Sequence, residues 1–279
     1  MNLEELIKNG SKQLKKSKTK TSLLDAEIIL SDLMGVTREF LITNNNMNIS
    51  DNIKKKFNHA INRRINNEPV AYITGKRDFW TETFAVNRAT LIPRPETELL
   101  IYKIIKFFRN KSINILDIGT GSGCILLSIL KELKFSRGTG IDISNLAIKV
   151  AINNSRRFNL SNRSKFKVFD INKFKFGKYD LIVSNPPYIP SKEIKKLSKD
   201  IRDYEPDIAL NGGKDGLDLI KKVIYKSSKL LKNNGLFAIE IGANQYLRVL
   251  AIMNKCGFRV VGKEFDYNDN VRCIISTKA

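Results

Sequence analysis

From position 113 onward the sequence alternates between two kinds of segment, and this alternation restricts the possible folds most strongly. Short apolar runs predict strands, and the stretches between them repeat apolar residues at helical spacing. The alternation predicts an α/β fold, in which helices cover both faces of a parallel sheet. We expect strands at 113–118, 139–143, 166–169, 179–184 and 236–241, helices at 124–133, 146–158, 217–231 and 245–256, and a closing pair of strands at 258–261 and 272–276.

The residues before this region predict two further parts. Residues 1–68 carry apolar side chains at helical spacing, which indicates a small helical bundle. Pro69 ends the bundle, and β-like runs at 71–75 and 79–86 predict a β-hairpin. We therefore expect three domains, namely the bundle at 1–68, a hairpin linker at 69–92 and an α/β domain at 93–279 that begins with a helix at 96–109.

The composition excludes several kinds of chemistry. His59 is the only histidine, so the sequence contains no HExxH motif and no Ser-His-Asp triad. Three scattered cysteines, Cys124, Cys256 and Cys273, form neither a disulfide framework nor a CxxC metal clip. The first residues lack the pattern of a secretory signal, and no apolar run is suited to span a membrane. We expect a cytoplasmic protein with no membrane association.

The net charge of +21 admits two interpretations. A strongly basic chain can bind nucleic acid. Here, however, the lysines are spread over the whole sequence and accompany many asparagines and isoleucines, as a bias in coding composition would produce. We favour the second interpretation, in which the charge mainly favours solubility and direct nucleic-acid binding is not expected.

A glycine-rich loop lies between the first strand and the first helix predicted for the α/β domain. Residues 117–123 read Asp-Ile-Gly-Thr-Gly-Ser-Gly. Glycines allow a sharp turn and close approach to a ligand, and exposed amides at a helix start favour an anionic group. Asp142 ends the next strand, where a carboxylate can accept hydrogen bonds from both ribose hydroxyls. Together these features predict an adenosine-containing ligand, although the spacing is not the G-x-G-x-x-G of dinucleotide-binding loops.

Three other acidic or apolar residues are assigned less specific roles. Asp117 has two interpretations, either as a scaffold that accepts hydrogen bonds within the loop or as a group that orients the ammonium of the ligand. Asp170, at the end of the third strand, can accept from an adenine amino group, and Ile171 can pack on the base.

The segment Asn185-Pro186-Pro187-Tyr188 follows a buried strand directly. A rigid turn is the plainest interpretation, because consecutive prolines restrict the backbone and remove amide donors. However, the Asn185 side-chain carbonyl and the Pro186 carbonyl are two acceptors that can hold a planar NH2 group by both hydrogens, and Tyr188 can form an aromatic wall. The irregular stretch 189–216 that follows is too long for a simple connection and predicts a substrate loop or lid.

These motifs resemble those of a known family. The Asn-Pro-Pro-Tyr segment together with the glycine loop is similar to S-adenosylmethionine-dependent methyltransferases that act on exocyclic or amide nitrogen. Further segments resemble the HemK/PrmC-type protein-glutamine methyltransferases over nearly the whole chain, namely 75–80, 91–98, 183–189, 202–206 and 212–218. The resemblance implies a class I methyltransferase Rossmann-like sheet with an N-terminal bundle that recognises the substrate.

The resemblance also implies an activity and a set of site residues. The methyl donor would be S-adenosylmethionine, with no metal, and the acceptor would be the glutamine of the Gly-Gly-Gln loop in peptide chain release factors. By position, the resemblance implies that Asn185, Pro186, Pro187 and Tyr188 form the catalytic glutamine site. It also implies cofactor contacts at Gly119, Thr120, Gly121, Ser122, Gly123, Asp142, Asp170, Ile171 and Asn185. Ile171 departs from the larger aromatic residue that relatives can carry at its position.

Three other functions stay open at this point. An adenine-N6 nucleic-acid methyltransferase uses a similar Asn-Pro-Pro-Tyr turn, but base chemistry normally requires an added recognition region, which the sequence does not indicate. A ribosomal-protein glutamine methyltransferase would differ only in its substrate. A catalytically inactive binding module is the third alternative, and the presence of Gly121, Asp142 and Asn185 argues against it.

Overall fold

The computed structural model describes residues 1–278, and the chain divides into two compact units. The smaller unit comprises Met1–Lys76 together with Ser198–Tyr204, and the larger comprises Arg77–Leu197 and the residues from Glu205 onward. The smaller unit therefore includes a short segment from far along the sequence, in which the Tyr204 hydroxyl donates to the Asn66 carbonyl at 2.8 Å.

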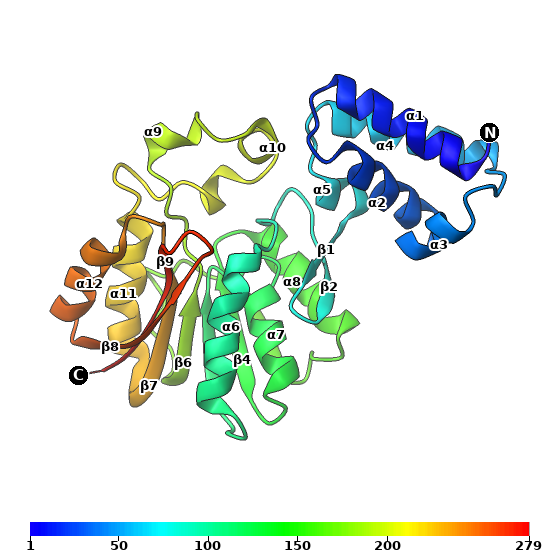
Figure 1. Ribbon diagram of the computed structural model, residues 1–279. Helices are drawn as coiled ribbons and strands as arrows, with labels where there is room; N and C mark the ends of the chain where they lie inside the picture. Colours follow the sequence, from blue (N-terminus) through cyan, green and yellow to red (C-terminus); the bar gives the residue numbers. More distant parts are fainter. Residues whose placement is uncertain (279) are drawn as a thin grey trace. The chain divides into compact units, whose positions relative to one another are not determined.

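The smaller unit is a helical bundle, coloured blue and cyan in Figure 1. The first helix begins with a capping box, because Asn2 Oδ1 accepts from the Glu5 amide and the Glu5 carboxylate accepts from the Asn2 amide. Its core contains Phe57, and a Cβ on Gly10 would lie only 2.7 Å from the Phe57 ring, so only glycine allows this approach. The helices are α1 (Leu3–Lys16), α2 (Ser22–Met34), α3 (Arg38–Thr43), α4 (Asp51–Ile65) and α5 (Val70–Thr74).

The strand predicted at 71–75 is wrong. Val70–Thr74 forms helix α5, which starts after Pro69 and ends at Gly75 in the left-handed conformation at φ +71°. Ala71 and Tyr72 are buried, so packing of this short helix overrides the strand preference of its apolar residues. A hairpin is present, but it is displaced along the sequence, with β1 at Lys76–Phe79 and β2 at Glu82–Ala85. The predicted second run at 79–86 thus contains the end of β1, the turn and β2. Within the larger unit, the Asn154 side chain accepts from the Ala85 amide and donates to the Ala85 carbonyl.

The larger unit contains one seven-stranded sheet in the order β5-β4-β3-β6-β7-β9-β8. The first five strands in this order are parallel, and β9 runs antiparallel to both of its neighbours. The bounds are β3 (Asn114–Ile118), β4 (Arg137–Asp142), β5 (Ser164–Val168), β6 (Tyr179–Ser184), β7 (Leu231–Glu240), β8 (Phe258–Phe265) and β9 (Val271–Lys278). The predicted α/β fold, with its closing pair of strands, is confirmed.

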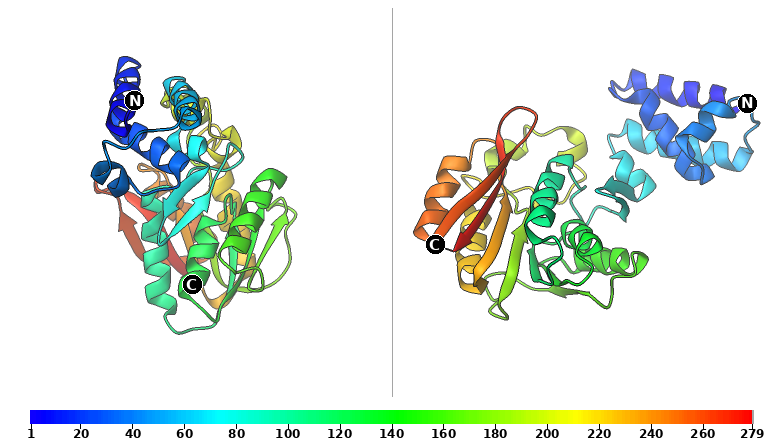
Figure 2. Two further views of the ribbon diagram at one scale, coloured as in Figure 1. Left: turned by 90° about the vertical axis from the view of Figure 1, so that its right-hand side faces the viewer. Right: turned by 60° about the horizontal axis from the view of Figure 1, so that its bottom comes forward.

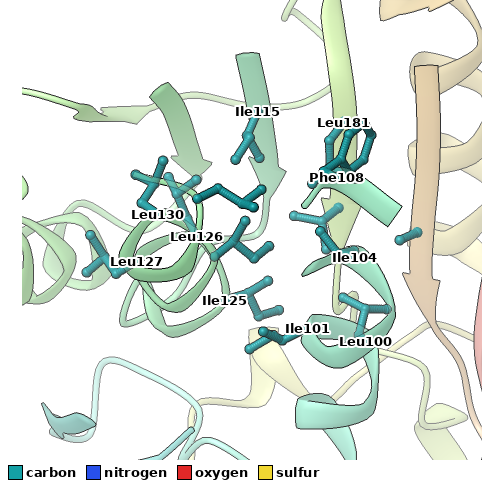
Figure 3. Packing of buried hydrophobic residues seen from close by; sticks show 14 of the residues in the cluster. Leu100, Ile101, Ile104, Phe108, Ile115, Ile125, Leu126, Leu127, Leu130 and Leu181 are labelled. Atoms are coloured by element: carbon teal, nitrogen blue, oxygen red, sulfur yellow. The ribbon is translucent and has the colours of Figure 1, made fainter. Parts of the chain in front are cut away.

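Helices cover both faces of this sheet, as the views in Figures 1 and 2 show. On one face α6 and α7 pack on β3 and β6 through aliphatic side chains such as Leu126 and Leu181 (Figure 3). A second cluster, which includes Ile224 and Val249, lies under α11 and α12 on the other face. The helices are α6 (Pro95–Phe108), α7 (Cys124–Glu132), α8 (Asn145–Arg157), α11 (Asp218–Leu230) and α12 (Tyr246–Lys255).

The predicted irregular stretch 189–216 contains only short elements. These are α9 (Ser191–Ile194), α10 (Lys199–Arg202) and the 3-10 turn Asp207–Ala209. Throughout residues 1–278, no helix combines the length and the apolar character that crossing a membrane requires.

Candidate active site

The register of the sheet places the predicted site segments next to one another. Ile118, the last residue of β3, pairs with Ile141 of β4 on one side and with Ser184 of β6 on the other. The glycine loop after β3 therefore starts between Asp142 and Asn185. The strand order reverses between β3 and β6, and open α/β sheets bind ligands at such a point.

A cavity of about 440 Å³ lies at this edge of the sheet. That volume is in the range of small-molecule sites, about 300 to 1,000 Å³. The cavity brings together most of the predicted site residues, because its lining includes Gly119, Thr120, Gly121, Ser122, Asp142, Asp170, Ile171, Asn185, Pro186 and Pro187. Among the described residues, Gly123 and Tyr188 do not belong to this lining, so direct ligand contacts of these two stay predictions.

The glycine loop has the backbone conformation that its composition predicts. Gly119, Gly121 and Gly123 all have positive φ, at +73°, +54° and +79°. Other residues rarely adopt this conformation. Gly123 caps the start of α7, and a Cβ there would lie 3.1 Å from the Leu127 side chain. Gly121 lines the cavity, and a Cβ there would meet no protein atom within 4 Å. Its lack of a side chain leaves room for a ligand against the loop.

Asp142 connects the loop to the next strand. Its Oδ2 accepts from the Gly121 amide at 3.0 Å, and its Oδ1 accepts from the Ser144 amide at 2.9 Å. Burial raises the pKa of the Asp142 carboxyl, and these backbone donors act in the opposite direction. Each carboxylate oxygen can still accept a further hydrogen bond, because an ionised carboxylate has about four acceptor positions. Asp142 thus supports the loop and can also bind a ligand diol.

Asp117 lies below the loop and is completely buried. Its Oδ2 accepts from the Thr120 hydroxyl at 2.6 Å, which supports the scaffold interpretation. Its Oδ1 and the neighbouring Ser122 Oγ are buried without a hydrogen-bond partner among the described residues. Burial is the largest of the effects that raise the pKa of Asp117 to about 7. Of these two residues only Ser122 belongs to the cavity lining. The second interpretation of Asp117, in which it orients an ammonium group of the ligand, therefore stays a prediction.

The raised pKa of Asp117 predicts a pH-dependent stability. The folded chain holds a proton on this carboxyl up to about pH 7, whereas the unfolded chain releases it near the ordinary pKa of about 3.9. The contribution of Asp117 to stability is therefore fully present below about pH 4 and decreases as the pH rises through about 7. Asp117→Asn keeps an acceptor for Thr120 and has no charge to bury.

We expect Asp117→Asn to gain stability relative to the wild type as the pH rises from 5 to 8. The measurement is the difference between the two unfolding temperatures at each pH, without ligand. A difference that stays constant over this range would contradict the protonation of Asp117 in the folded chain.

Asn185 is oriented by a chain of buried hydrogen bonds. Its Nδ2 donates to Thr97 Oγ1 at 3.2 Å, and the Thr97 hydroxyl donates to Glu240 Oε2 at 2.6 Å. Glu240 ends β7 opposite Asn185, because Ser184 pairs with Ile239. Among the described residues no hydrogen-bond donor reaches Asn185 Oδ1. The arrangement agrees with the prediction that this oxygen is an acceptor for a bound group.

Tyr188 is held at the other end of the same segment. Its hydroxyl donates to Glu240 Oε1 at 3.2 Å and accepts from Arg272 Nη2 at 2.7 Å. Burial, more than the neighbouring Glu240, raises the pKa of Tyr188 far above its usual range. Tyr188 is therefore not suited to act as a base. Its observed contacts anchor the turn, whereas the aromatic wall predicted for it is not part of the cavity lining.

Two rim segments of the cavity are joined by Glu205. Its carboxylate accepts from the Ile92 amide at 3.2 Å and from Arg94 Nη2 at 2.5 Å. Pro93 and Arg94 line the cavity from one side, and residues 206, 208 and 209 line it from the other. The part of the predicted lid that follows Glu205 is thus attached to the rim.

The sequence analysis did not assign a role to Thr97, Glu240, Arg272 or Glu205. Thr97 and Glu205 lie in segments that carry the family resemblance, but the segments alone do not indicate what their side chains contact. Glu240 could have been found, because it is the one charged residue in the apolar run 236–241. A carboxylate in a buried strand requires hydrogen-bonding or charged partners.

Comparison with protein families and structures agrees with this fold. Residues 109–259 match a family model described as a methyltransferase domain, and residues 5–75 match one described as the PrmC N-terminal domain. The chain is also similar to the crystal structure of a methyltransferase from Pyrococcus furiosus, with a TM-score of 0.53 and 19% identity over 70% of this chain and 88% of that one. The fold and the family match together define a methyltransferase.

Similar sequences narrow this class further. A release factor glutamine methyltransferase of Buchnera aphidicola subsp. Schizaphis graminum is 39% identical over 100% of both chains. One of Clostridium acetobutylicum is 36% identical over 100% of this chain and 99% of its own. The chain belongs to the release factor glutamine methyltransferase family.

Proposed function

We propose that this protein transfers a methyl group from S-adenosylmethionine to the side-chain amide nitrogen of the glutamine in the Gly-Gly-Gln loop of peptide chain release factors. The observation that carries the proposal is that the Asn185 turn and the glycine loop with Asp142 line the same cavity. The proposal is also supported by relatives named release factor glutamine methyltransferase, which are similar to this chain over their full length.

The residues around the glycine loop suit S-adenosylmethionine. Asp142 can accept from the ribose hydroxyls, and the buried Ile171 offers an apolar surface to the adenine. Ser122 lines the cavity, and its Oγ, which has no hydrogen-bond partner among the described residues, can bind the amino-acid end. When bound, the donor supplies a methyl group on a positively charged sulfur, which is already activated for transfer. For this reason the proposed reaction requires no metal.

The turn at Asn185–Tyr188 offers two carbonyl acceptors that can bind the NH2 group of a carboxamide. An amide nitrogen is a poor nucleophile because its lone pair is shared with the carbonyl, and the rotation barrier of about 18 to 20 kcal/mol gives the scale of this conjugation. Asn185 Oδ1 and the Pro186 carbonyl would accept the two NH2 hydrogens. This contact would favour charge on the nitrogen and direct it toward the donor, and such alignment can contribute about 7 to 11 kcal/mol.

Transfer of a labelled methyl group tests this function. Purified release factor is incubated with the protein and methyl-labelled S-adenosylmethionine, beside a release factor whose Gly-Gly-Gln glutamine is replaced by alanine. We expect label in the first substrate only, on the glutamine side chain as located by mass spectrometry. Label in both substrates, or in neither, would overturn the proposal. Ribosomal protein and DNA in parallel reactions test the two alternative methyltransferases.

We propose in addition that the bundle at 1–68 recognises the release factor, whereas residues 93–279 carry out the transfer and 69–92 connect the two. A concave surface of the bundle supports this division, because it combines basic side chains with apolar ones. It has a volume of about 370 Å³, and the bundle residues that line it include Ile29, Leu33, Lys55, Lys56 and Arg63. Lys55 and Lys56 are exposed on α4 and are available to a partner.

Reversing these two charges tests the role of the bundle. We expect Lys55→Glu with Lys56→Glu to raise KM for intact release factor by about tenfold, which equals about 1.4 kcal/mol of binding. Because the cavity is unaltered, KM for a short Gly-Gly-Gln peptide is expected to stay the same. Equal effects on both substrates would argue against recognition by the bundle.

A further inference from the structure

The orientation of the Asn185 side chain depends on two residues outside the glutamine site. Thr97 has a single hydroxyl hydrogen, which it donates to Glu240 Oε2 at 2.6 Å. Toward Asn185 the Thr97 oxygen can then act only as an acceptor. Asn185 must therefore direct its NH2 group to Thr97, at 3.2 Å, and its carbonyl oxygen away from it.

Glu240 is suited to set this direction because donors surround it. The side chain is fully buried, with the hydroxyls of Thr97 and Tyr188 at its two oxygens and Arg272 Nη2 3.6 Å from Oε1. Arg272 supplies the opposite charge that a buried carboxylate requires. Burial raises the pKa of the Glu240 carboxyl, whereas the hydrogen bonds from Thr97 and Tyr188 and the charge of Arg272 oppose this rise. In its ionised form Glu240 has no hydrogen to donate, so the hydrogen bonds from Asn185 through Thr97 to Glu240 then run in one direction only.

The same carboxylate also holds the other end of the turn. Tyr188 donates to Glu240 Oε1, and Gln245 Nε2 donates to the Tyr188 carbonyl at 2.9 Å. The Asn185–Tyr188 segment is thus attached at both ends to one buried group on β7. This attachment maintains the positions of the Asn185 and Pro186 carbonyls. A reaction that depends on alignment requires such fixed positions.

We propose that Thr97 and Glu240 are positioning residues for methyl transfer, because they fix the side-chain amide of Asn185 with its carbonyl oxygen toward the bound glutamine. This inference rests on the proposed function of the cavity. Without the Thr97 hydroxyl, Asn185 could turn over by about 180°. It would then present its own NH2 group to the NH2 group of the substrate, and two donors cannot form a hydrogen bond.

Two substitutions at position 97 distinguish the effect of the hydroxyl group from the effect of the side-chain shape. Thr97→Val has nearly the same shape and lacks the hydroxyl, and Thr97→Ser keeps it. We expect Thr97→Val to lower kcat by at least about tenfold, because Asn185 loses its fixed orientation. KM for S-adenosylmethionine is expected to stay the same, since the glycine loop and Asp142 are untouched. Thr97→Ser is expected to restore kcat to within about threefold of the wild type.

A merely structural role for Thr97 would give a different result. It would change the unfolding temperature and the amount of active protein, but it would not separate kcat from KM. Normal kcat in Thr97→Val, or a kcat in Thr97→Ser as low as in Thr97→Val, would overturn the inference. If Thr97→Val does not fold, as judged by circular dichroism, Thr97→Ala replaces it under the same expectations.

Wild-type protein and Asn185→Ala, measured in the same assay, distinguish failure of this inference from failure of the proposed function. An inactive wild type with release factor would overturn the function. An active wild type with an impaired Asn185→Ala and a fully active Thr97→Val would overturn only the role of Thr97 and Glu240.

Discussion

Replacing Asn185 by alanine is expected to lower kcat for release factor by at least about tenfold and by up to about a thousandfold. The variant loses the Oδ1 acceptor that would hold one hydrogen of the glutamine NH2 group. The upper value is typical of removing one preorganised hydrogen-bonding group from an active site. The measurement is single-turnover transfer of labelled methyl at saturating donor and release factor.

Binding of the donor serves as the control for this variant. Asn185 lies at the side of the cavity opposite Asp142 in the sheet register, so the loop contacts remain in Asn185→Ala. Because Asn185 is itself expected to contact the donor, calorimetry with S-adenosylmethionine should show a loss of affinity in Asn185→Ala that is smaller than that in Asp142→Ala. Normal methyl transfer by Asn185→Ala would refute the two-acceptor contact, whatever the result for binding.

Replacing Asp142 by alanine is expected to weaken the binding of S-adenosylmethionine by about a hundredfold. Hydrogen bonds to a charged group contribute about 1.5 to 3 kcal/mol each, and the ribose offers two hydroxyl donors. The variant also frees the Gly121 amide, which Asp142 holds at 3.0 Å. Calorimetry on the folded variant measures the loss, and Asp142→Asn, which keeps one acceptor oxygen, should show a smaller one.

Lowering the pH should weaken the binding of S-adenosylmethionine, as replacement of Asp142 does. Burial raises the pKa of Asp142, and a protonated carboxyl has fewer acceptor positions for the ribose. The affinity of the wild type is therefore expected to fall as the pH decreases toward the acidic range, whereas that of Asp142→Asn should change less. Unchanged binding by Asp142→Ala would exclude this residue as the ribose ligand.

Structural features that depend on residues close together in the sequence were predictable from the sequence. Strand and helix periodicity after position 113 was sufficient to predict the α/β fold, because each element is recognised from its own residues. The positions of Asp142 and Asn185 were also predictable as a pair, since both lie at the carboxyl ends of strands and parallel strands end at the same edge of the sheet. The family resemblance contributed the type of reaction.

Features that depend on distant contacts were not predictable. Thr97 and Glu240 lie on different elements, and only the folded sheet brings their side chains to 2.6 Å. Residues 198–204 likewise belong to the smaller unit although they lie far from it in the sequence. The helix at 70–74 was missed for a related reason, because packing of Ala71 and Tyr72 outweighs local strand preference.

The most direct test of this account is a crystal structure of the protein with S-adenosylhomocysteine and a peptide that contains Gly-Gly-Gln. We predict the glutamine nitrogen within hydrogen-bonding distance of both Asn185 Oδ1 and the Pro186 carbonyl, with the nucleoside against Gly121 and Asp142. A glutamine side chain bound elsewhere, or Asn185 Oδ1 turned toward Thr97 in the complex, would contradict the central claim.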